Sequence, residues 1–396
     1  MQDVRHLFKN IICIVLSVAL WMSVFSPGSA YAATADASMR SVEGLNGNNW
    51  MSGIADDRYI YEINLPGTHD SATVYCKNAT DNAVKLFGIP VFNSGRFAKT
   101  QSLTLSEQLN AGVRYLDLRF SAQDGKLLLC HGNNKKVRPV NIAVKVLEFF
   151  NPELALLGIA GYPLLRLDTE FYAYEDEACA TLLTCDSALR QVMDFLEENP
   201  SETVIITAKK ENGDAEEYLK LLKEQIEMLQ TQINPSTQEA YLYTENGNGV
   251  YTKMPALSEV RGKIILMSPD YEALGVGDML DAKNDAGQTD FMGMTFHYEN
   301  HWSAAADEKA QYVNSFVAEY SAEMSKEPGQ HSACANVIKT NANNLPAQSP
   351  YDVAETVNDA LYSQNKLENG RYYGWIMGDF MTEEICRAIW QTNYFD

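Results

Sequence analysis

The sequence predicts an α/β fold in which short strands alternate with amphipathic helices, as in an incomplete (β/α)8 barrel. From residue 59 onward, short apolar runs are followed by longer segments with apolar residues three or four positions apart. The expected strands are residues 61–65, 115–119, 127–130, 203–208, 263–267, 292–296 and 373–377. The expected helices are residues 105–110, 188–198, 215–229, 304–325, 353–363 and 383–391.

The composition is that of an ordinary globular protein, with 396 residues of which 46% are hydrophobic and 21% charged. We expect one catalytic domain over residues 59–396, an N-terminal extension over 33–58 and an insertion at about 133–184. Within this insertion, residues 140–167 are rich in apolar side chains interrupted by proline and glycine. Two interpretations stay open for them: a packed helical hairpin, or a lid or membrane-docking element.

The first 32 residues have the pattern of a secretory signal peptide. Arg5 and Lys9 precede an apolar run over residues 11–25, and Ala30-Tyr31-Ala32 supplies a cleavage pattern. We therefore expect a secreted, extracellular protein, with an uncleaved anchor as the alternative. Removal of this segment leaves six of the seven cysteines, which suits an oxidising compartment. Cys179 and Cys185 could close a small loop, and buried free thiols are the alternative for the others.

The formal net charge of −21 argues against a nucleic-acid partner. It also argues against binding to an anionic membrane by electrostatics alone. A lipid surface would have to be reached through apolar side chains or a local basic patch.

Reactive side chains follow three of the expected strands. His69 and Asp70 come after the first strand and its Pro66-Gly67 turn, Asp117 and Arg119 end the second, and His131 ends the third. Barrel enzymes place their reactive groups at the carboxyl ends of strands. Two histidines can act on a phosphodiester as base and acid, and an arginine between them offsets the developing negative charge.

A series of motifs resembles, in order, bacterial phosphatidylinositol-specific phospholipase C. The motifs are LPGTHDS at 65–71, GVRYLDLR at 112–119, His131-Gly132, NPSET at 199–203, KKE at 209–211, RGK at 261–263 and GWIMGD at 374–379. The match is dense over residues 60–268 and sparser beyond them. The resemblance implies a distorted TIM-type barrel and a secreted enzyme that needs no metal.

The resemblance also implies a role for individual residues. His69 would be the general base, His131 the general acid and Arg119 the phosphate stabiliser, with Asp379 orienting His69 and Asp70 paired with His131. The implied substrate-binding residues are Asp117, Lys209, Asn300 and Trp302.

The sequence departs from the family at two of these positions and at a third place. Asn300 and Trp302 stand where an aspartate and a tyrosine are expected, and Ser268-Pro269 stands where an arginine is expected. An amide can still hydrogen-bond and an indole can still stack, so head-group preference is the property most affected.

No metal and no other cofactor are expected, because the Arg119 guanidinium would repel a divalent cation at the phosphate. His297 and His301 offer an alternative zinc pair, although a structural or pocket-lining role is the simpler interpretation.

The predicted function is cleavage of phosphatidylinositol to diacylglycerol and inositol 1,2-cyclic phosphate, with glycosylated inositol lipids as further candidate substrates. The expected partners are phosphatidylinositol in membranes or micelles and a transient membrane surface, with no nucleic acid, and the protein is expected to be a monomer. The alternatives are a metal-dependent glycerophosphodiester phosphodiesterase-like enzyme and a catalytically silent inositol-lipid-binding module.

Overall fold

The structure is a computed structural model that describes residues 44–78, 84–86, 89–92, 98–132, 170–245, 250–280, 285–325, 334–342, 348–363 and 367–393. The expected signal peptide and residues 140–167 lie outside this described part. The helices are α3 (Leu105–Ala111), α6 (Cys185–Glu198), α7 (Ala215–Thr231), α8 (Leu257–Val260), α9 (Tyr271–Leu274), α10 (Ala306–Tyr320), α11 (Pro350–Asn358) and α12 (Glu383–Trp390), with 3-10 turns η1 (Trp50–Gly53) and η2 (Ile60–Glu62) and a π-helical turn η3 (Asp359–Ser363).

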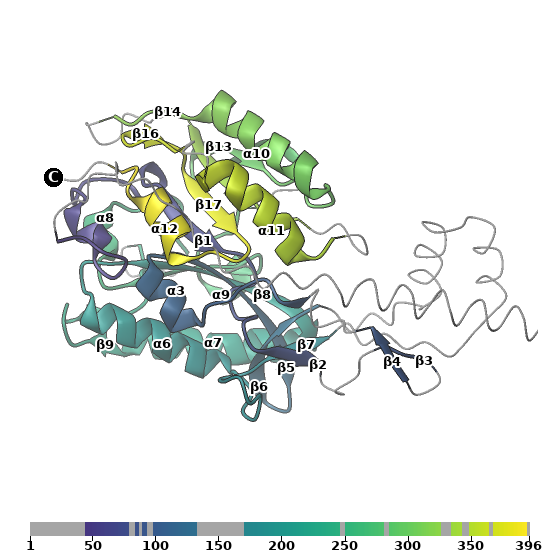
Figure 1. The fold of residues 1–396 in the computed structure, drawn as a ribbon. Coiled ribbons are helices and arrows are strands. Elements are labelled where there is room, and N and C mark those ends of the chain that lie inside the picture. Colours follow the sequence, from purple (N-terminus) through teal and green to yellow (C-terminus); the bar gives the residue numbers. More distant parts are fainter. Residues whose placement is uncertain are drawn as a thin grey trace, which may run out of the picture.

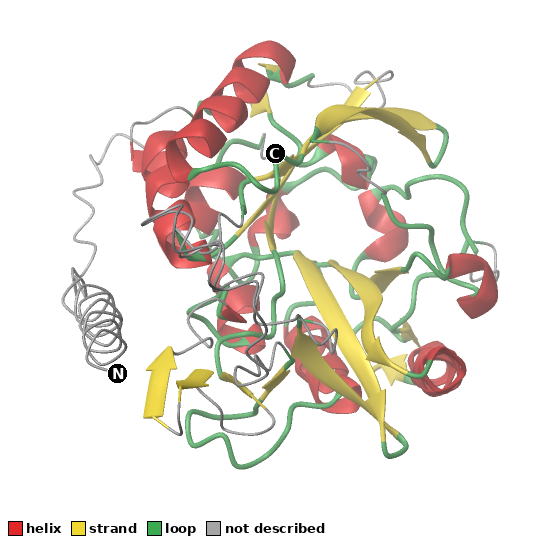
Figure 2. Ribbon diagram, turned by 90° about the vertical axis from the view of Figure 1, so that its right-hand side faces the viewer, coloured by secondary structure: helices red, strands yellow, loops and turns green. Residues whose placement is uncertain are grey.

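Seven parallel strands form the barrel in the spatial order β13-β15-β17-β1-β5-β8-β11. They are β1 (Leu65–Thr68), β5 (Tyr115–Gln123), β8 (Val204–Gly213), β11 (Ile264–Met267), β13 (Met294–Glu299), β15 (Cys334–Lys339) and β17 (Trp375–Gly378). Among the described residues no pairing joins β11 to β13, so the barrel is open there. Helices lie outside the strands, with α6 and α7 on one side and α10, α11 and α12 on the other (Figures 1 and 2). The expected incomplete barrel is confirmed.

Shorter antiparallel strands extend the sheet or form separate pairs. β6 (Lys126–His131) pairs with β5 and β7 (Phe171–Ala173), β7 with β2 (Cys76–Asn78), and β12 (Ala286–Phe291) with β13. The separate pairs are β3 (Val84–Leu86) with β4 (Ile89–Phe92), β9 (Ile233–Asn234) with β10 (Glu239–Ala240), and β14 (Ala322–Glu323) with β16 (Arg371–Tyr372).

Three expected elements differ from the structure. Residues 60–62 form a 3-10 turn, so the first barrel strand begins only at Leu65. The strand expected at 127–130 is the returning arm of a β5–β6 hairpin and not a strand of the parallel barrel. The helix expected at 304–325 ends at Tyr320, and β15, which the sequence pattern did not predict, follows at Cys334–Lys339.

Helix starts are fixed by side chains that accept hydrogen bonds from the first turn. Thr104, Thr184, Asp214, Ser349 and Thr382 accept from backbone N–H groups at the starts of α3, α6, α7, α11 and α12. At the other end of α3, Gly112 adopts φ of 109°, where a side chain would be strained and a Cβ would collide with the Trp390 ring.

Aromatic rings fill the barrel below its carboxyl end. The ring centroid of Trp375 lies 5.6 Å from that of Tyr115 and 5.8 Å from that of Phe296. Trp50, from the segment expected as an N-terminal extension, is fully buried against Trp390 and donates to the Gly112 carbonyl. Because apolar rings fill the interior, polar side chains that point into the barrel can be accommodated only near the carboxyl ends of the strands.

No helix in the described ranges is both long enough and apolar enough to cross a membrane. Cys76, Cys130, Cys179, Cys185 and Cys386 are free thiols, so the small loop considered between Cys179 and Cys185 is not closed by a disulfide.

Candidate active site

Strand register places the polar residues in one layer above the aromatic core. Gly67 pairs with Met377 on β17 and with Tyr115 on β5. A Cβ on Gly67 would lie 3.0 Å from side-chain atoms of both neighbours, so all three positions face the barrel interior. Side chains alternate along a strand, so the residues two positions further on also face inward. These are His69, Asp117 and Asp379.

His69 is held by Asp379. Its Nδ1 lies 2.8 Å from Asp379 Oδ1, and both side chains are buried. The Arg119 Nη2 lies 3.0 Å from the other ring nitrogen, Nε2. The same Nε2 also lies 3.2 Å from Asp70 Oδ2, so a donor and an acceptor both flank this nitrogen. A neutral His69 with its proton on Nδ1 donates to Asp379 and accepts from Arg119. Burial raises the pKa of Asp379. The electrostatic interaction with His69 and the hydrogen bond from its ring oppose that rise.

His131 is held by Asp70 in the same manner. Its Nδ1 lies 2.7 Å from Asp70 Oδ2, and the described residues make no hydrogen bond or ion pair with the other ring nitrogen, Nε2. Burial alone would lower the pKa of His131, but the Asp70 charge and hydrogen bond raise it above its ordinary value. The histidine reaches the barrel rim because β6 returns antiparallel to β5, which extends past the rim as far as Gln123.

Arg119 lies between the two histidines and contacts three carboxylates. Its Nε contacts Asp70, its Nη2 lies 3.1 Å from Asp117 Oδ2, and its Nη1 lies 3.6 Å from Glu211. Burial opposes ionisation, but these carboxylates raise the pKa of Arg119 above its ordinary value. Burial disfavours the Asp70 carboxylate, but Arg119 and then His131 bring the pKa of Asp70 well below its usual range. The site is thus a desolvated network of alternating charges.

Lys209 joins this network from the neighbouring strand. Register places Lys209 opposite Arg119 on β5, and its Nζ lies 2.9 Å from Asp117 Oδ1. Burial opposes ionisation of Asp117, but Lys209 and Arg119 together lower its pKa. Asp117 therefore holds both cations at the barrel mouth.

The loop after β13 brings Trp302 to the site. The Trp302 ring lies edge-on to His69, with centroids 5.4 Å apart, and 39% of the residue is exposed. Asn300 is partly buried on the same loop, and its backbone N–H donates to the Asp285 carbonyl. Trp302 can therefore cover one side of a ligand that contacts His69.

The alternative zinc pair does not converge on one point. His297 stacks on Tyr320 and His301 stacks on Tyr312, both on α10 at the outside of the barrel. His301 also contacts Glu299 through Nδ1. These contacts fit the structural interpretation of the two histidines.

A different group, His69, Asp70 and Asp117, has donor atoms within 4.8 Å of one another. The guanidinium of Arg119 contacts all three of these residues. A divalent cation placed among them would meet this fixed positive charge, so the donor set does not suit a metal ion.

Gln101 and Thr100 link the loop that carries His69 to the loop that carries Asp379, and the sequence motifs single out neither residue. Gln101 Nε2 donates to the carbonyls of His69 and Gly378, at 2.8 and 3.0 Å. Thr100 donates to the carbonyls of His69 and Asp70 and accepts from the N–H of Phe380. These bonds involve backbone atoms, so they leave no recognisable pattern in the sequence.

Two residues beside the expected motifs position the His131 turn. Glu211 Oε1 accepts from the Gly132 N–H at 3.1 Å, and Asn212 Nδ2 donates to the Gly132 carbonyl at 2.6 Å. Glu211 belongs to the KKE motif at 209–211, which could have singled it out. A further cation, Lys339, lies at the end of the strand that the sequence did not predict.

Two cysteines line a narrow hollow beside His131 and Arg119, namely Cys76 and Cys130. Burial is the main cause that raises the pKa of the Cys76 thiol to about 12, and it also raises that of Cys130. Both thiols stay protonated near neutral pH, which makes them poor nucleophiles.

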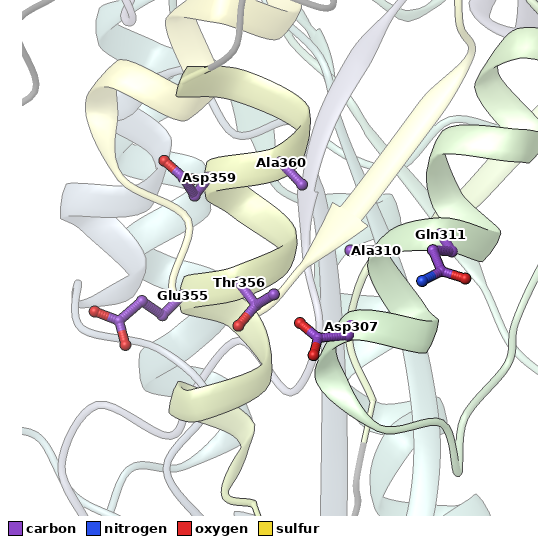
Figure 3. A pocket seen from close by; sticks show the side chains of 7 residues that line it. All are labelled: Asp307, Ala310, Gln311, Glu355, Thr356, Asp359 and Ala360. Carbon is purple, nitrogen blue, oxygen red and sulfur yellow. The ribbon is translucent and has the colours of Figure 1, made fainter.

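A second hollow of about 600 Å³ lies between α10 and α11 (Figure 3). Three carboxylate residues, Asp307, Glu355 and Asp359, line it together with Thr356 and Gln311. None of the catalytic candidates borders it. Its negative charge would repel a phosphodiester, so the barrel mouth is the better site for such a substrate.

Comparison with known proteins confirms the expected resemblance to bacterial phosphodiesterases of the phosphatidylinositol-specific phospholipase C class. The 1-phosphatidylinositol phosphodiesterase of Staphylococcus aureus (strain NCTC 8325 / PS 47) is 22% identical over 386 residues, which cover 95% of this chain and 93% of that protein. The protein of the same name from Listeria monocytogenes is 26% identical over 253 residues, which cover 62% of this chain and 58% of that protein. No protein-family model matches the chain.

Solved structures show the same fold. The phosphatidylinositol-specific phospholipase C of Staphylococcus aureus superposes with a TM-score of 0.59 at 19% identity, over 88% of this chain and 98% of that one. The enzyme of the same class from Listeria monocytogenes gives 0.55 at 18% identity, over 89% and 100%. The distorted barrel that the resemblance implied is therefore confirmed.

Proposed function

We propose that this protein is a secreted phosphatidylinositol-specific phospholipase C that needs no metal ion. One observation carries the proposal. His69 contacts Asp379 through Nδ1, His131 contacts Asp70 through Nδ1, and the Arg119 guanidinium lies between the two histidines. The relatives named 1-phosphatidylinositol phosphodiesterase support the substrate class.

His69 is the general base in this proposal. Its Nε2 is the acceptor nitrogen, and Asp379 stabilises the imidazolium that forms when the base takes a proton. In the substrate complex the phosphate accepts the hydrogen bond that Arg119 otherwise donates to His69. The His69 Nε2 is then available to accept from the inositol 2-hydroxyl. The hydroxyl proton moves to Nε2 while its oxygen forms a bond to phosphorus.

His131 is the general acid. Asp70 raises the pKa of His131, so the imidazolium is available to donate its Nε2 proton. The bond from phosphorus to the diacylglycerol oxygen breaks, and that oxygen takes the proton. The products are diacylglycerol and inositol 1,2-cyclic phosphate, and attack by the neighbouring hydroxyl gains from proximity.

Arg119 stabilises the negative charge that develops on the phosphate oxygens. Its buried contacts with Asp70 and Asp117 fix the guanidinium before substrate arrives. The fixed positive charge occupies the position that a catalytic divalent cation would need, which supports metal-independent catalysis. Asp117, Lys209, Asn300 and Trp302 would line the head-group pocket.

The test is phosphorus NMR of the purified mature protein with phosphatidylinositol micelles in excess EDTA. We expect the resonance of cyclic inositol phosphate to appear with the wild type and not with His131→Ala. Activity that requires added calcium, or that appears only with a glycerophosphodiester, would reject the proposal. Parallel reactions with a glycosylated phosphatidylinositol would show whether the pocket accepts substituents on the inositol ring.

A further inference from the structure

Lys339 is a cation of the barrel mouth without an ion pair in the described part of the chain. The other two cations there are neutralised, Arg119 by its carboxylates and Lys209 by Asp117. For the ammonium of Lys339 the described residues supply no carboxylate within ion-pair distance and no hydrogen-bond acceptor. The residue is only partly exposed, and a polar ligand that accepts hydrogen bonds from the ammonium would offset the cost of burying its charge.

Strand register shows that Lys339 faces the inside of the barrel. It lies at the carboxyl end of β15 and pairs with Met377 on β17. The Met377 side chain faces the interior, as its closeness to the Cβ position of Gly67 shows, and paired residues of parallel strands share a face. Lys339 therefore begins one layer below Asp379, and its long side chain extends toward the polar layer.

The charged groups that act electrostatically on Lys339 belong to three elements. They are Lys209 on β8, Asp117 and Arg119 on β5, and Lys309 on α10. Burial and then repulsion by Lys209 lower the pKa of Lys339 to about 8, while Asp117 opposes that shift. Lys339 is thus mostly charged at neutral pH and begins to lose its charge about two pH units earlier than an ordinary lysine.

We propose that Lys339 is a substrate-binding residue that donates hydrogen bonds from the floor of the mouth to the hydroxyl groups of the head-group ring. This inference rests on the proposed function and adds a contact that its catalytic machinery does not include. The phosphodiester is bound one layer higher, at Arg119 and the two histidines. The ring attached to that phosphate is the part of the substrate that can descend toward Lys339 and Lys209.

The experiment uses dihexanoyl phosphatidylinositol as a monomeric substrate and myo-inositol as a competitive inhibitor. The variants are Lys339→Met, which keeps the length without the charge, Lys339→Arg, and the exposed control Lys220→Met on α7. We expect Lys339→Met to raise KM and the myo-inositol inhibition constant about tenfold, with a smaller change in kcat. Lys220→Met should behave as the wild type.

The pH dependence gives an independent measurement. The wild-type KM should rise above about pH 8 as Lys339 loses its proton. Lys339→Arg should move this rise to higher pH, and Lys339→Met should abolish it. Unchanged KM and inhibition constants in Lys339→Met at all pH values would overturn the inference, as would a loss confined to phosphatidylinositol 4-phosphate, which would indicate a phosphate contact instead.

Two controls separate this inference from other failures. Circular dichroism and thermal unfolding should show Lys339→Met to be as stable as the wild type or more stable, because it removes an unpaired charge. If Lys339→Met did not fold, Lys339→Gln would be measured in its place. An inactive wild type would reject the proposed function, and calorimetry of myo-inositol binding to wild type and variant would still test the ring contact.

Discussion

Asp70 Oδ2 lies 2.7 Å from His131 Nδ1, and the same carboxylate contacts Arg119 through its other oxygen. Asp70 adopts φ of 42°, a left-handed conformation that aspartate tolerates better than most residues. The turn after β1 thus places the Asp70 carboxylate in contact with both His131, the proposed general acid, and Arg119, the proposed phosphate-binding residue. Because Asp70 is almost completely buried, its negative charge acts on both groups with little screening.

Replacement of this carboxylate should shift the pH profile. In Asp70→Asn, His131 loses the charge that raises its pKa, so its imidazolium should deprotonate at lower pH. We expect the basic limb of the kcat/KM profile to move toward acid, and kcat to fall by about a hundredfold or more. The profile is measured with short-chain phosphatidylinositol, and Asp186→Asn on the surface of α6 serves as control.

The same pair contributes to stability in a defined pH range. The folded-state pKa of His131 is raised above the ordinary value of 6.5, so its protonation stabilises the fold below that pH. This contribution is lost as the pH rises through the folded-state pKa. Urea unfolding of wild type and His131→Ala at pH 5.5 and 8.5 should therefore show a larger difference at the lower pH, and equal differences would contradict the assigned shift.

Removal of either imidazole should abolish most turnover. His69→Ala and His131→Ala are each expected to lower kcat by about a thousandfold, because the first removes the general base and the second removes the general acid. His297→Ala is the matched control, since His297 stacks on Tyr320 away from the site. Circular dichroism should be unchanged, and near-normal rates in either site variant would refute the two-histidine mechanism.

The barrel and most of the candidate site could be predicted because local pattern and position agree there. His69 follows the end of β1, and Asp117 lies within β5 one position after the residue that pairs with Thr68, so strand register brings the two side chains to the same level. His131 lies at the rim as expected, but it arrives there because β6 returns in a hairpin and not as the end of a parallel strand. No periodicity in the sequence distinguishes an antiparallel return from a further parallel strand.

The unpredicted residues depend on long-range backbone contacts or on a weak strand. β15 contains Cys, Ala, Asn and Lys among only six residues, so its apolar alternation is slight, and Lys339 was overlooked with it. Gln101 acts on carbonyls at 69 and 378, which only the folded barrel brings together. Such contacts follow from tertiary structure and have no signature within a short window of sequence.

Gln101 should act as a positioning residue. Gln101→Leu leaves the carbonyls of His69 and Gly378 and the N–H of Met381 without this partner. We expect the free energy of unfolding to fall by about 1–3 kcal/mol. We also expect kcat to fall about tenfold or more with little change in KM, because the histidine and its carboxylate separate.

Urea denaturation and steady-state kinetics check this prediction, with Gln230→Leu on the exposed face of α7 as control. A purely structural role would lower stability and leave the kcat of the folded fraction unchanged. Gln101→Glu should not recover the kcat lost by Gln101→Leu, since an ionised carboxylate accepts from the Met381 N–H but cannot donate to the His69 and Gly378 carbonyls.

A buried ion pair next to the Trp302 loop supplies the last prediction. Lys309 Nζ lies 2.7 Å from Glu299 Oε2, and both side chains are essentially inaccessible to solvent. Burial lowers the pKa of Lys309, and Glu299 opposes that shift. Glu299 Oε1 accepts from the backbone N–H of His301, so the pair also anchors the chain one residue before Trp302.

Lys309→Met should destabilise the protein by about 3–5 kcal/mol, because it leaves a buried carboxylate without its cation. The double variant Glu299→Gln with Lys309→Met removes that charge and should recover much of the loss, and Lys223→Met on the exposed face of α7 should have little effect. In the single and the double variant the Glu299–Lys309 pair no longer holds the chain before Trp302 in place. The KM for short-chain phosphatidylinositol should therefore rise, while the shape of the pH profile should not change. Urea unfolding measures the first effect and steady-state kinetics the second. Equal destabilisation in the single and the double variant would show that packing, and not the uncompensated Glu299 charge, accounts for the loss.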